Sequence, residues 1–377
     1  MKQYEEFPKP AGSYTVGRTQ MDFNYIAKDN SQRQLTAFFF YPSDSSEGKP
    51  TAQYAFPELP TLREELLKKL GNTADEQLFV SIRTWCYEDL KLSDKEKQYP
   101  VLLYSHGASS IPQQGTVICS ELASAGYIVV SVGHPGGGMF KLRDGRLVNM
   151  TRDFMDSTVD YGMEAVTLIT PQLVFEKLDM PEAVEISRKL TSAPEAVKFS
   201  RFADLQSEDI GYVADCLERI NSGETDSIFK SRLQLDIGMG AFGHSLGGTT
   251  AAIVCRDDKR FVCGVNYDGN MLGALDSDLG KPFMQLCTVL AYNTNAFLLE
   301  TNSTETYFFI IDNAHHYDFS DTLFTIRNEM FKGTREPEEM RHIIMEYTKT
   351  FFDRYLLKKQ ADIESIKYEG IQMIKKP

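Results

Sequence analysis

The residues best suited to chemistry lie in the segment Gly243-His244-Ser245-Leu246-Gly247-Gly248. A serine hydroxyl is a weak nucleophile until a base removes its proton and a third group orients that base. The pattern Gly-x-Ser-x-Gly suits a sharp turn from a strand into a helix, where side chains at Gly243 and Gly247 would clash with the turn. An apolar stretch precedes the segment and another follows it, as this turn requires. We therefore predict that Ser245 is a nucleophile at a helix N-terminus, where developing negative charge is favoured.

Chain order narrows the choice of base. In folds that use this motif the acid and the base follow the serine, with the histidine last. Two of the six histidines come too early, one lies inside the turn, and one lies on the final predicted helix. That leaves the adjacent pair after the last predicted strand, and spacing alone does not separate its two members. The six, in order, are His106, His134, His244, His315, His316 and His342, and the pair is His315-His316.

The acid should stand at the carboxyl end of a strand, within reach of the far nitrogen of the histidine. Asp268 directly follows the predicted strand 261–267, whereas no carboxylate closely follows the next strand, 283–286. Asp268 is therefore the first candidate, and Asp276 and Asp278 are the alternatives. A plain Asp-Gly turn at Asp268 and Gly269 is the simpler reading of the same residues.

A tetrahedral intermediate also needs two preorganised amides for its oxyanion. One is the amide of Leu246, directly after the serine. The other is expected from the loop after the strand 100–105, where Gly107 permits a turn that aims the amide of Ala108 inward. An ordinary tight turn is the alternative interpretation of Ser105-His106-Gly107.

The elements that must position these residues alternate between strand and helix, which is typical of a sheet covered on both faces. With the serine turn, this pattern predicts an α/β-hydrolase fold with a mostly parallel sheet in a single domain, 1–377. The expected strands cover 15–25, 34–41, 100–105, 127–132, 237–242, 261–267, 283–286 and 307–311. The expected helices cover 115–124, 209–220, 248–255 and 337–359.

Two helical insertions are expected outside the minimal sheet, at 56–98 and 139–209. The second should form a lid over the carboxyl edge of the sheet. Its apolar residues could line an acyl pocket, or could only complete the core of the insertion, and the sequence favours neither. These residues are Val166, Leu168, Ile169, Leu173, Val174 and Phe175.

Composition limits the classes of partner and the cellular location that we expect for this protein. The 377 residues are 42% hydrophobic and carry a formal charge of -13, which disfavours nucleic acid and anionic membrane surfaces. No apolar stretch approaches the roughly 20 residues of a membrane span. Six cysteines in mostly apolar surroundings indicate reduced thiols and a cytoplasmic location, although a removed leader would leave no trace and secretion stays open. No cofactor or metal is expected, since the adjacent histidines lack partners at ligand spacing. The oligomeric state is left open.

These motifs resemble the platelet-activating-factor acetylhydrolase family, both the plasma and the intracellular type II enzymes. The resemblance implies an acid directly after the strand that follows the serine helix, which matches Asp268. It implies a histidine three residues before Phe319, which selects His316 over His315. The matching segments are YSHG at 104–107, ELASAGYIVVSVGH at 121–134, GHSLGG at 243–248, RFVCGVNYDG at 260–269 and HHYDFSD at 315–321.

Two departures affect what the resemblance implies about the acyl group. The family often carries His-Arg-Asp where this chain has His134-Pro135-Gly136, and commonly has phenylalanine where this chain has Leu246. The family hydrolyses short or oxidised acyl groups from the sn-2 position of phospholipids without calcium. We therefore expect a serine carboxylic-ester hydrolase that acts on short-acyl or phospholipid-type esters. The alternatives are a general esterase for small, acetylated or polyester-like substrates, and a non-catalytic binding protein on the same fold.

Overall fold

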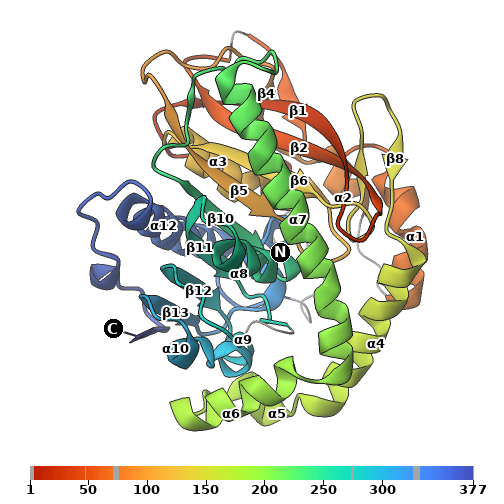
Figure 1. The fold of residues 1–377 in the computed structure, drawn as a ribbon, viewed down its shortest axis with the longest axis vertical. Coiled ribbons are helices and arrows are strands. Elements are labelled where there is room, and N and C mark those ends of the chain that lie inside the picture. Colours follow the sequence, from red (N-terminus) through yellow and green to blue (C-terminus); the bar gives the residue numbers. More distant parts are fainter. Residues whose placement is uncertain (1–3, 47, 71–75, 273–275, 326–331, 377) are drawn as a thin grey trace.

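The computed structural model describes residues 4–46, 48–70, 76–272, 276–325 and 332–376, and within them one sheet joins twelve strands (Figure 1). The strands lie in the order β14-β13-β12-β11-β10-β5-β6-β2-β1-β4-β3, with β9 paired to β5. Their bounds are β1 Thr15–Ile26, β2 Gln32–Ser43, β3 Thr51–Gln53, β4 Arg83–Glu88, β5 Tyr99–Ser105, β6 Ile128–Gly133, β9 Leu233–Gln234, β10 Met239–His244, β11 Phe261–Tyr267, β12 Phe283–Cys287, β13 Thr306–Ile311 and β14 Ile371–Lys376.

The centre of the sheet is parallel, from β6 through β5, β10, β11 and β12 to β13. The outer strands β2 and β14 pair antiparallel to this block. Every residue of β5, β6, β10, β12 and β13 is buried, which explains why these strands read as continuous apolar runs. The carboxyl ends of the parallel strands meet at one edge, so residues that directly follow them come together. The predicted mostly parallel α/β-hydrolase sheet is confirmed.

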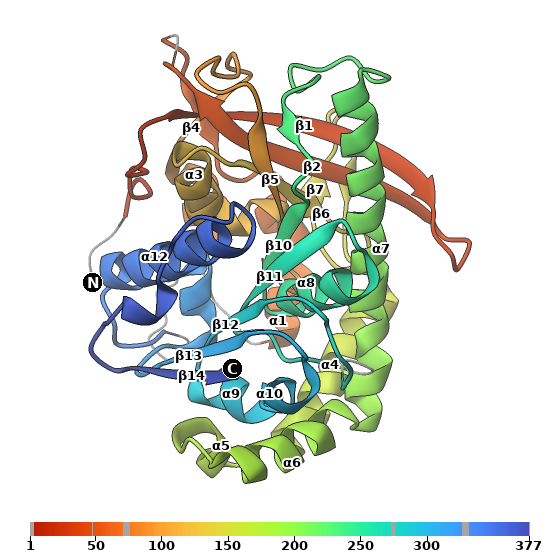
Figure 2. The same ribbon diagram turned by 60° about the vertical axis from the view of Figure 1, so that its left-hand side comes forward.

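Helices cover both faces of the sheet (Figure 2). α3 and α12 pack together on one face, and α8 packs on the other face against β10 and β11, with α7 outside it. The buried residues of α12 include Met340, Ile343, Tyr347 and Phe351, which confirms the predicted three-four spacing. The bounds are α3 Thr116–Ser124, α7 Pro194–Ser222, α8 Leu246–Asp257 and α12 Pro337–Tyr355.

The expected second insertion contains α4 (Arg152–Leu168), α5 (Pro171–Phe175), α6 (Met180–Thr191) and the first half of α7. Threonine or aspartate caps α4, α5 and α6 at Thr151, Thr170 and Asp179, and each side chain accepts a hydrogen bond from a backbone amide in the first turn. The structure differs from the expected end at 209. α7 continues through this position as one helix of 29 residues, because no proline interrupts it after its first turn.

The first insertion is only partly helical. α1 (Leu59–Leu70) and α2 (Glu76–Ser81) are helices, and residues 71–75 of the expected range lie outside the described part. Residues 83–88 form β4 instead of the expected helix. Thr84 and Cys86 point inward while their neighbours are more exposed, which is the two-residue period of a strand. β14 was also absent from the sequence-based prediction.

The remaining elements are short. They connect the sheet strands or flank the site, and they comprise the β7–β8 hairpin (Phe140–Lys141 and Leu147–Val148), α9 Val289–Asn295, α10 Leu298–Thr301, α11 Thr322–Thr325, and 3₁₀ turns at Pro112–Gly115, His316–Phe319 and Ile363–Ser365. All six cysteines are buried and none is in a disulfide. Across the described ranges, no helix is long and apolar enough to cross a membrane.

Candidate active site

Ser245 occupies the turn between β10 and α8 with φ 57° and ψ −124°, a strained conformation for a residue with a side chain. A Cβ added at Gly243 would lie 2.3 Å from the carbonyl oxygen of Gly247, and one at Gly247 would lie 2.0 Å from that of Ser105. At Gly248 it would lie 1.6 Å from Asn266 Oδ1. The turn therefore needs glycine at these positions for close approach.

Asp268 directly follows β11, and the structure brings His316 to it. His316 Nδ1 lies 2.8 Å from Asp268 Oδ2, and the Asp268 side chain is almost fully buried while that of His316 is 35% exposed. His315 lines the same cavity, whereas the hydrogen bond to Asp268 is made by Nδ1 of His316. Burial, with the adjacent His316, lowers the pKa of His315. Asp276, one of the alternative acids, instead pairs with Arg188 at the surface.

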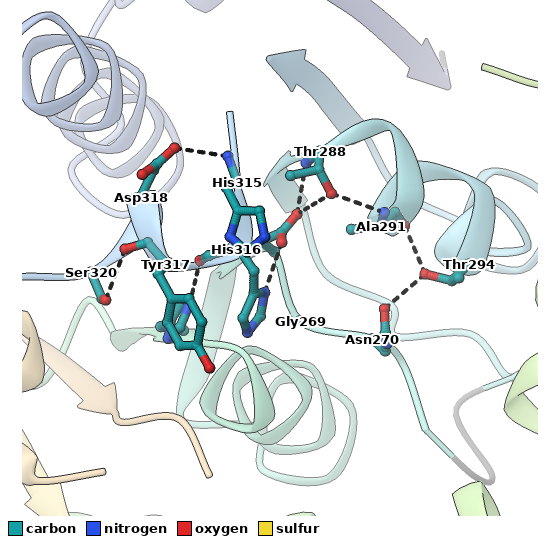
Figure 3. A network of polar contacts seen from close by, with 12 residues as sticks. Gly269, Asn270, Thr288, Ala291, Thr294, His315, His316, Tyr317, Asp318 and Ser320 are labelled. Atoms are coloured by element: carbon teal, nitrogen blue, oxygen red, sulfur yellow. Dashed lines mark hydrogen bonds and ion pairs between the residues drawn. The ribbon is translucent and has the colours of Figure 1, made fainter. Parts of the chain in front are cut away.

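Thr288 is a residue that sequence reasoning missed. It follows β12, the strand beside β11, and donates to Asp268 Oδ1 from its backbone amide at 2.7 Å and from its hydroxyl at 2.8 Å. The same hydroxyl oxygen caps α9 by accepting from the amide of Ala291 (Figure 3). Asp268 thus receives hydrogen bonds on both oxygens, which orients the carboxylate toward His316. A threonine at the end of the neighbouring parallel strand is the signal that could have identified this residue.

The segment after Asp268 is hydrogen-bonded to the side chain of Asn266 and packs against Ser245. Asn266 accepts from the amide of Gly269 at 2.9 Å and donates to its carbonyl oxygen at 2.7 Å. A Cβ at Gly269 would lie 2.0 Å from the carbonyl oxygen of Ser245. Asp268 therefore lies at a bend that the Asn266 side chain closes, and it presents its carboxylate from there.

The two predicted oxyanion residues, Ala108 and Leu246, line the cavity that contains Ser245. Gly107 is needed here for room rather than for backbone freedom, because its φ is not positive. A Cβ at Gly107 would lie 3.1 Å from His244 Nδ1 and 3.2 Å from Ser245 Cβ. The turn that carries Ala108 is therefore packed directly against the serine.

The cavity has a volume of about 780 Å³, within the usual range for small-molecule sites. Its floor includes Ser245, Asp268 and His316, and one wall comes from the second insertion through residues of α4, α5 and α7. Tyr161 of α4 and Phe199 of α7 stack with ring centroids 5.1 Å apart, and both line this wall. Tyr161 also accepts a hydrogen bond from Asn270, two residues after Asp268.

The six apolar residues expected in an acyl pocket or an insertion core divide between several environments. Val174 and Phe175 line the cavity, and Leu168 and Ile169 line a smaller pocket beside it. Leu173 is buried in the core, whereas Val166 is 76% exposed. Two of the six residues therefore line the cavity of Ser245 and one belongs to the core, and binding of an acyl chain by Val174 and Phe175 stays a prediction.

The histidines excluded by chain order are buried in a separate polar cluster. His134 Nδ1 lies 2.9 Å from Asp209 Oδ2, and His134 Nε2 lies 3.2 Å from Ser105 Oγ. Burial lowers the pKa of His106 to about 3, with the nearby His134 adding to the effect. In the described residues, no three His, Cys, Asp or Glu side chains are grouped so as to hold a metal ion.

Asp318 anchors the loop that carries His315 and His316. Its Oδ2 accepts from the amides of His315 at 2.8 Å and Gly333 at 2.9 Å. Burial raises the pKa of Asp318 to about 6, against these hydrogen bonds, which lower it.

The chain is similar to known acetylhydrolases. The family model described as platelet-activating factor acetylhydrolase, isoform II, matches residues 1–137, which end before Ser245. The platelet-activating factor acetylhydrolase of Canis lupus familiaris is 27% identical over 271 residues, covering 70% of this chain. That of Cavia porcellus is 23% identical over 380 residues, covering 93% of this chain and 78% of the relative. The resemblance to the platelet-activating factor acetylhydrolase family is confirmed.

These matches cover different shares of this chain and of its relatives. The chain spans about half the length of two of these acetylhydrolases, with 55% of the Canis lupus familiaris and Bos taurus proteins covered. Among solved structures, a ferulic acid esterase from Streptomyces cinnamoneus matches with a TM-score of 0.71 at 18% identity. That match covers 98% of this chain and 99% of the esterase, and it supports the α/β-hydrolase fold.

Proposed function

We propose that this chain is a serine carboxylic-ester hydrolase that works through an acyl-enzyme. One observation carries the proposal: Ser245, His316 and Asp268 all line the same cavity, and His316 Nδ1 lies 2.8 Å from Asp268 Oδ2. A nucleophile, a base and an orienting carboxylate are the groups that acyl transfer requires.

In the first half-reaction His316 Nε2 takes the proton of the Ser245 hydroxyl as its oxygen attacks the ester carbonyl carbon. The carbonyl oxygen becomes an oxyanion, which the amides of Leu246 and Ala108 stabilise. Collapse of this intermediate expels the alcohol, which takes the proton from His316. Asp268 accepts the hydrogen bond from His316 Nδ1 and so keeps that proton on Nδ1.

In the second half-reaction His316 deprotonates a water molecule that attacks the acyl carbon. The second intermediate collapses to a carboxylic acid, and the proton returns to Ser245. This sequence consumes one water per ester and needs no cofactor.

Short-acyl and phospholipid-type esters are the substrates that we propose first, because the acetylhydrolases that this chain resembles are named for platelet-activating factor. A general esterase for small, acetylated or polyester-like substrates is the second candidate. The stacked rings of Tyr161 and Phe199 support it, since they give the cavity an aromatic surface against which a planar group of a small ester can pack. Nitrophenyl esters of increasing chain length, followed by a phosphatidylcholine with an sn-2 acetyl group, separate the two candidates.

Labelling with a fluorophosphonate probe tests the central assignment. We expect the wild-type protein to be labelled and to hydrolyse nitrophenyl acetate, and Ser245→Ala to do neither. Equal labelling of Ser245→Ala would contradict the assignment of Ser245. Absence of label and of hydrolysis in a folded wild-type protein would favour the third reading, a binding protein on the hydrolase fold.

The remaining assignments are proposals of the same kind. We propose that residues 139–209 serve as a lid over the site of a single-domain enzyme, supported by the lining residues from α4, α5 and α7. A cytoplasmic location is supported by the six buried free thiols. The charge of -13 supports the absence of a nucleic-acid partner and of stable membrane insertion.

A further inference from the structure

Two side chains outside the proposed triad lie between three parts of the site that are far apart in the sequence. Gln114 Oε1 accepts from the amide of Gly107 at 2.8 Å. Gln114 Nε2 lies 3.2 Å from His244 Nδ1, and His244 Nε2 lies 2.9 Å from the carbonyl oxygen of His316. The chain of contacts thus joins the oxyanion turn, the residue before the nucleophile, and the backbone of the base.

Only one arrangement of protons satisfies all three contacts. A carbonyl oxygen can only accept, so His244 must carry its proton on Nε2 and donate to His316. Nδ1 of His244 is then an acceptor and takes a hydrogen bond from the side-chain nitrogen Nε2 of Gln114. The amide oxygen of Gln114 is left to accept from Gly107, which is what the structure shows.

This arrangement requires a neutral His244, and its surroundings keep it neutral. The His244 side chain is buried, and burial, with the nearby His316, lowers its pKa well below the ordinary value. Gln114 is also buried. The rings of His244 and His316 lie 4.6 Å apart, so the two histidines are packed together as well as hydrogen-bonded through the backbone.

We propose that Gln114 and His244 are positioning residues that hold the oxyanion turn, the nucleophile and the base in mutual register. The inference rests on the proposed function, because it assigns these residues a role in that reaction. Close packing at Gly107, whose added Cβ would meet both His244 and Ser245, shows that the three parts have little room to shift separately. Misplacement of reacting groups by about 1 Å can cost a hundredfold in rate.

We call the chain of contacts from Gly107 through Gln114 and His244 to the carbonyl oxygen of His316 the relay. A double-mutant cycle tests it. We expect Gln114→Ala and His244→Phe each to lower kcat by about 10- to 100-fold with KM changed by less than about threefold. Because both residues act through one chain of contacts, the double variant should lose little more than either single variant. Gln113→Ala is the matched control, since Gln113 is the neighbouring buried glutamine and its side chain is not part of the relay. Multiplicative losses in the double variant, or an equal loss in the control, would overturn the proposal.

A near-isosteric variant gives a readout that a purely structural role would not move. In Gln114→Glu the introduced carboxylate can still accept from Gly107 but cannot donate to His244. The two contacts of His244, with the introduced carboxylate and with the carbonyl oxygen of His316, can then form only if His244 is protonated on both nitrogens. We expect kcat of this variant to fall as pH rises and His244 loses its second proton, along an alkaline limb that the wild type lacks. A profile parallel to the wild type would contradict the relay.

The labelling rate separates failure of this inference from failure of the proposed function. A folded wild-type protein that neither labels with fluorophosphonate nor hydrolyses esters removes the proposed function, and the relay with it. A wild-type protein that labels while all relay variants label at the same rate removes the relay alone. Thermal unfolding of each variant identifies any that lose activity by losing the fold, and Gln114→Glu, which preserves shape, then decides the outcome.

Discussion

At the scale of single residues, the candidate acid is held by more than its histidine. Asp268 Oδ1 receives two hydrogen bonds from Thr288, while Oδ2 faces His316. Hydrogen bonds to a charged group each contribute more than those between neutral groups. Thr288 should therefore affect the orientation of the base although it does not touch the serine.

Replacing Thr288 by valine should lower kcat by about tenfold, because the hydroxyl bond is lost while the backbone amide still donates to Asp268. The change should also reduce the free energy of unfolding by about 1 kcal/mol, since the hydroxyl caps α9. Steady-state kinetics and urea denaturation measure the two effects.

Thr294→Val is the matched control, because Thr294 is a buried threonine of α9 itself and its hydroxyl donates to Asn270 rather than to Asp268. Its kcat should stay within about twofold of the wild type. An equal loss in both variants would mean that the contact with Asp268 has no particular role.

At the scale of elements, a buried charge cluster fastens the long helix α7 to the sheet. Asp209 of α7 accepts hydrogen bonds from Arg33 of β2 and Tyr25 of β1, and bonds His134 after β6. Burial by itself would raise the pKa of Asp209, but the hydrogen bonds from His134 and Arg33 outweigh it and keep the pKa below its ordinary value. The first half of α7 contributes Phe199 to the cavity, so this cluster also holds one wall of the site.

Asp209→Asn should reduce the free energy of unfolding by about 3–5 kcal/mol, because it leaves the buried Arg33 without its charge partner. Urea denaturation checks the value. Glu208→Gln, at the adjacent half-buried position, keeps an oxygen that can accept from the amide of Lys28 and should change it by less than about 0.5 kcal/mol. A loss below about 1 kcal/mol in Asp209→Asn would show that the cluster contributes little to holding α7.

The loop that carries the base should respond to pH through Asp318, whose pKa is raised to about 6 by burial. A raised pKa means that the folded protein holds a proton that the unfolded chain has already released. Asp318 therefore contributes stability that is fully present below about pH 4 and is lost as pH rises through about 6. Asp318→Asn cannot ionise and should lack this loss.

The difference in unfolding free energy between wild type and Asp318→Asn should accordingly shift in favour of the variant as pH rises from about 4 to 7, by at most about 3 kcal/mol. Urea denaturation at several pH values measures it. Curves that stay parallel over this range would mean that Asp318 does not titrate there.

At the scale of the whole molecule, the last described strand closes one edge of the sheet. β14 pairs with β13 along its full length, and all six residues of β13 are buried. The loop with His315 and His316 follows β13 directly. An uncovered apolar edge strand pairs readily with other chains.

Deleting residues 371–377 should therefore lower the midpoint of thermal unfolding and produce concentration-dependent aggregation, visible by size-exclusion chromatography. Met373→Lys is the control, since this side chain lies on β14 and is 38% exposed. A truncated protein that runs and unfolds like the full chain would show that β13 needs no cover.

Much of this molecule could be predicted from local pattern. The continuous apolar runs identify the parallel strands, because strands buried on both faces must be apolar throughout. The glycines around Ser245 identify the turn, because only glycine fits the close approaches seen there. Ser245, Asp268 and the histidine pair each come shortly after a predicted parallel strand. Their approach to one edge of the sheet could therefore be predicted. β4 and β14 were not predicted because each is only six residues long and partly exposed, so few residues carry the strand pattern.

What the tertiary structure decided depends on neighbours across the sheet. Spacing in the sequence left His315 and His316 equivalent, and the contact of 2.8 Å between His316 and Asp268 distinguishes them. Thr288 meets Asp268 only because β12 lies beside β11, and Gln114 meets His244 only because the turn after β5 packs against the end of β10. Hydrogen bonds between side chains of separate strands leave no periodic trace in the sequence. The serine turn was therefore determined by the sequence alone, whereas the groups that orient its base were determined by the packing of the sheet.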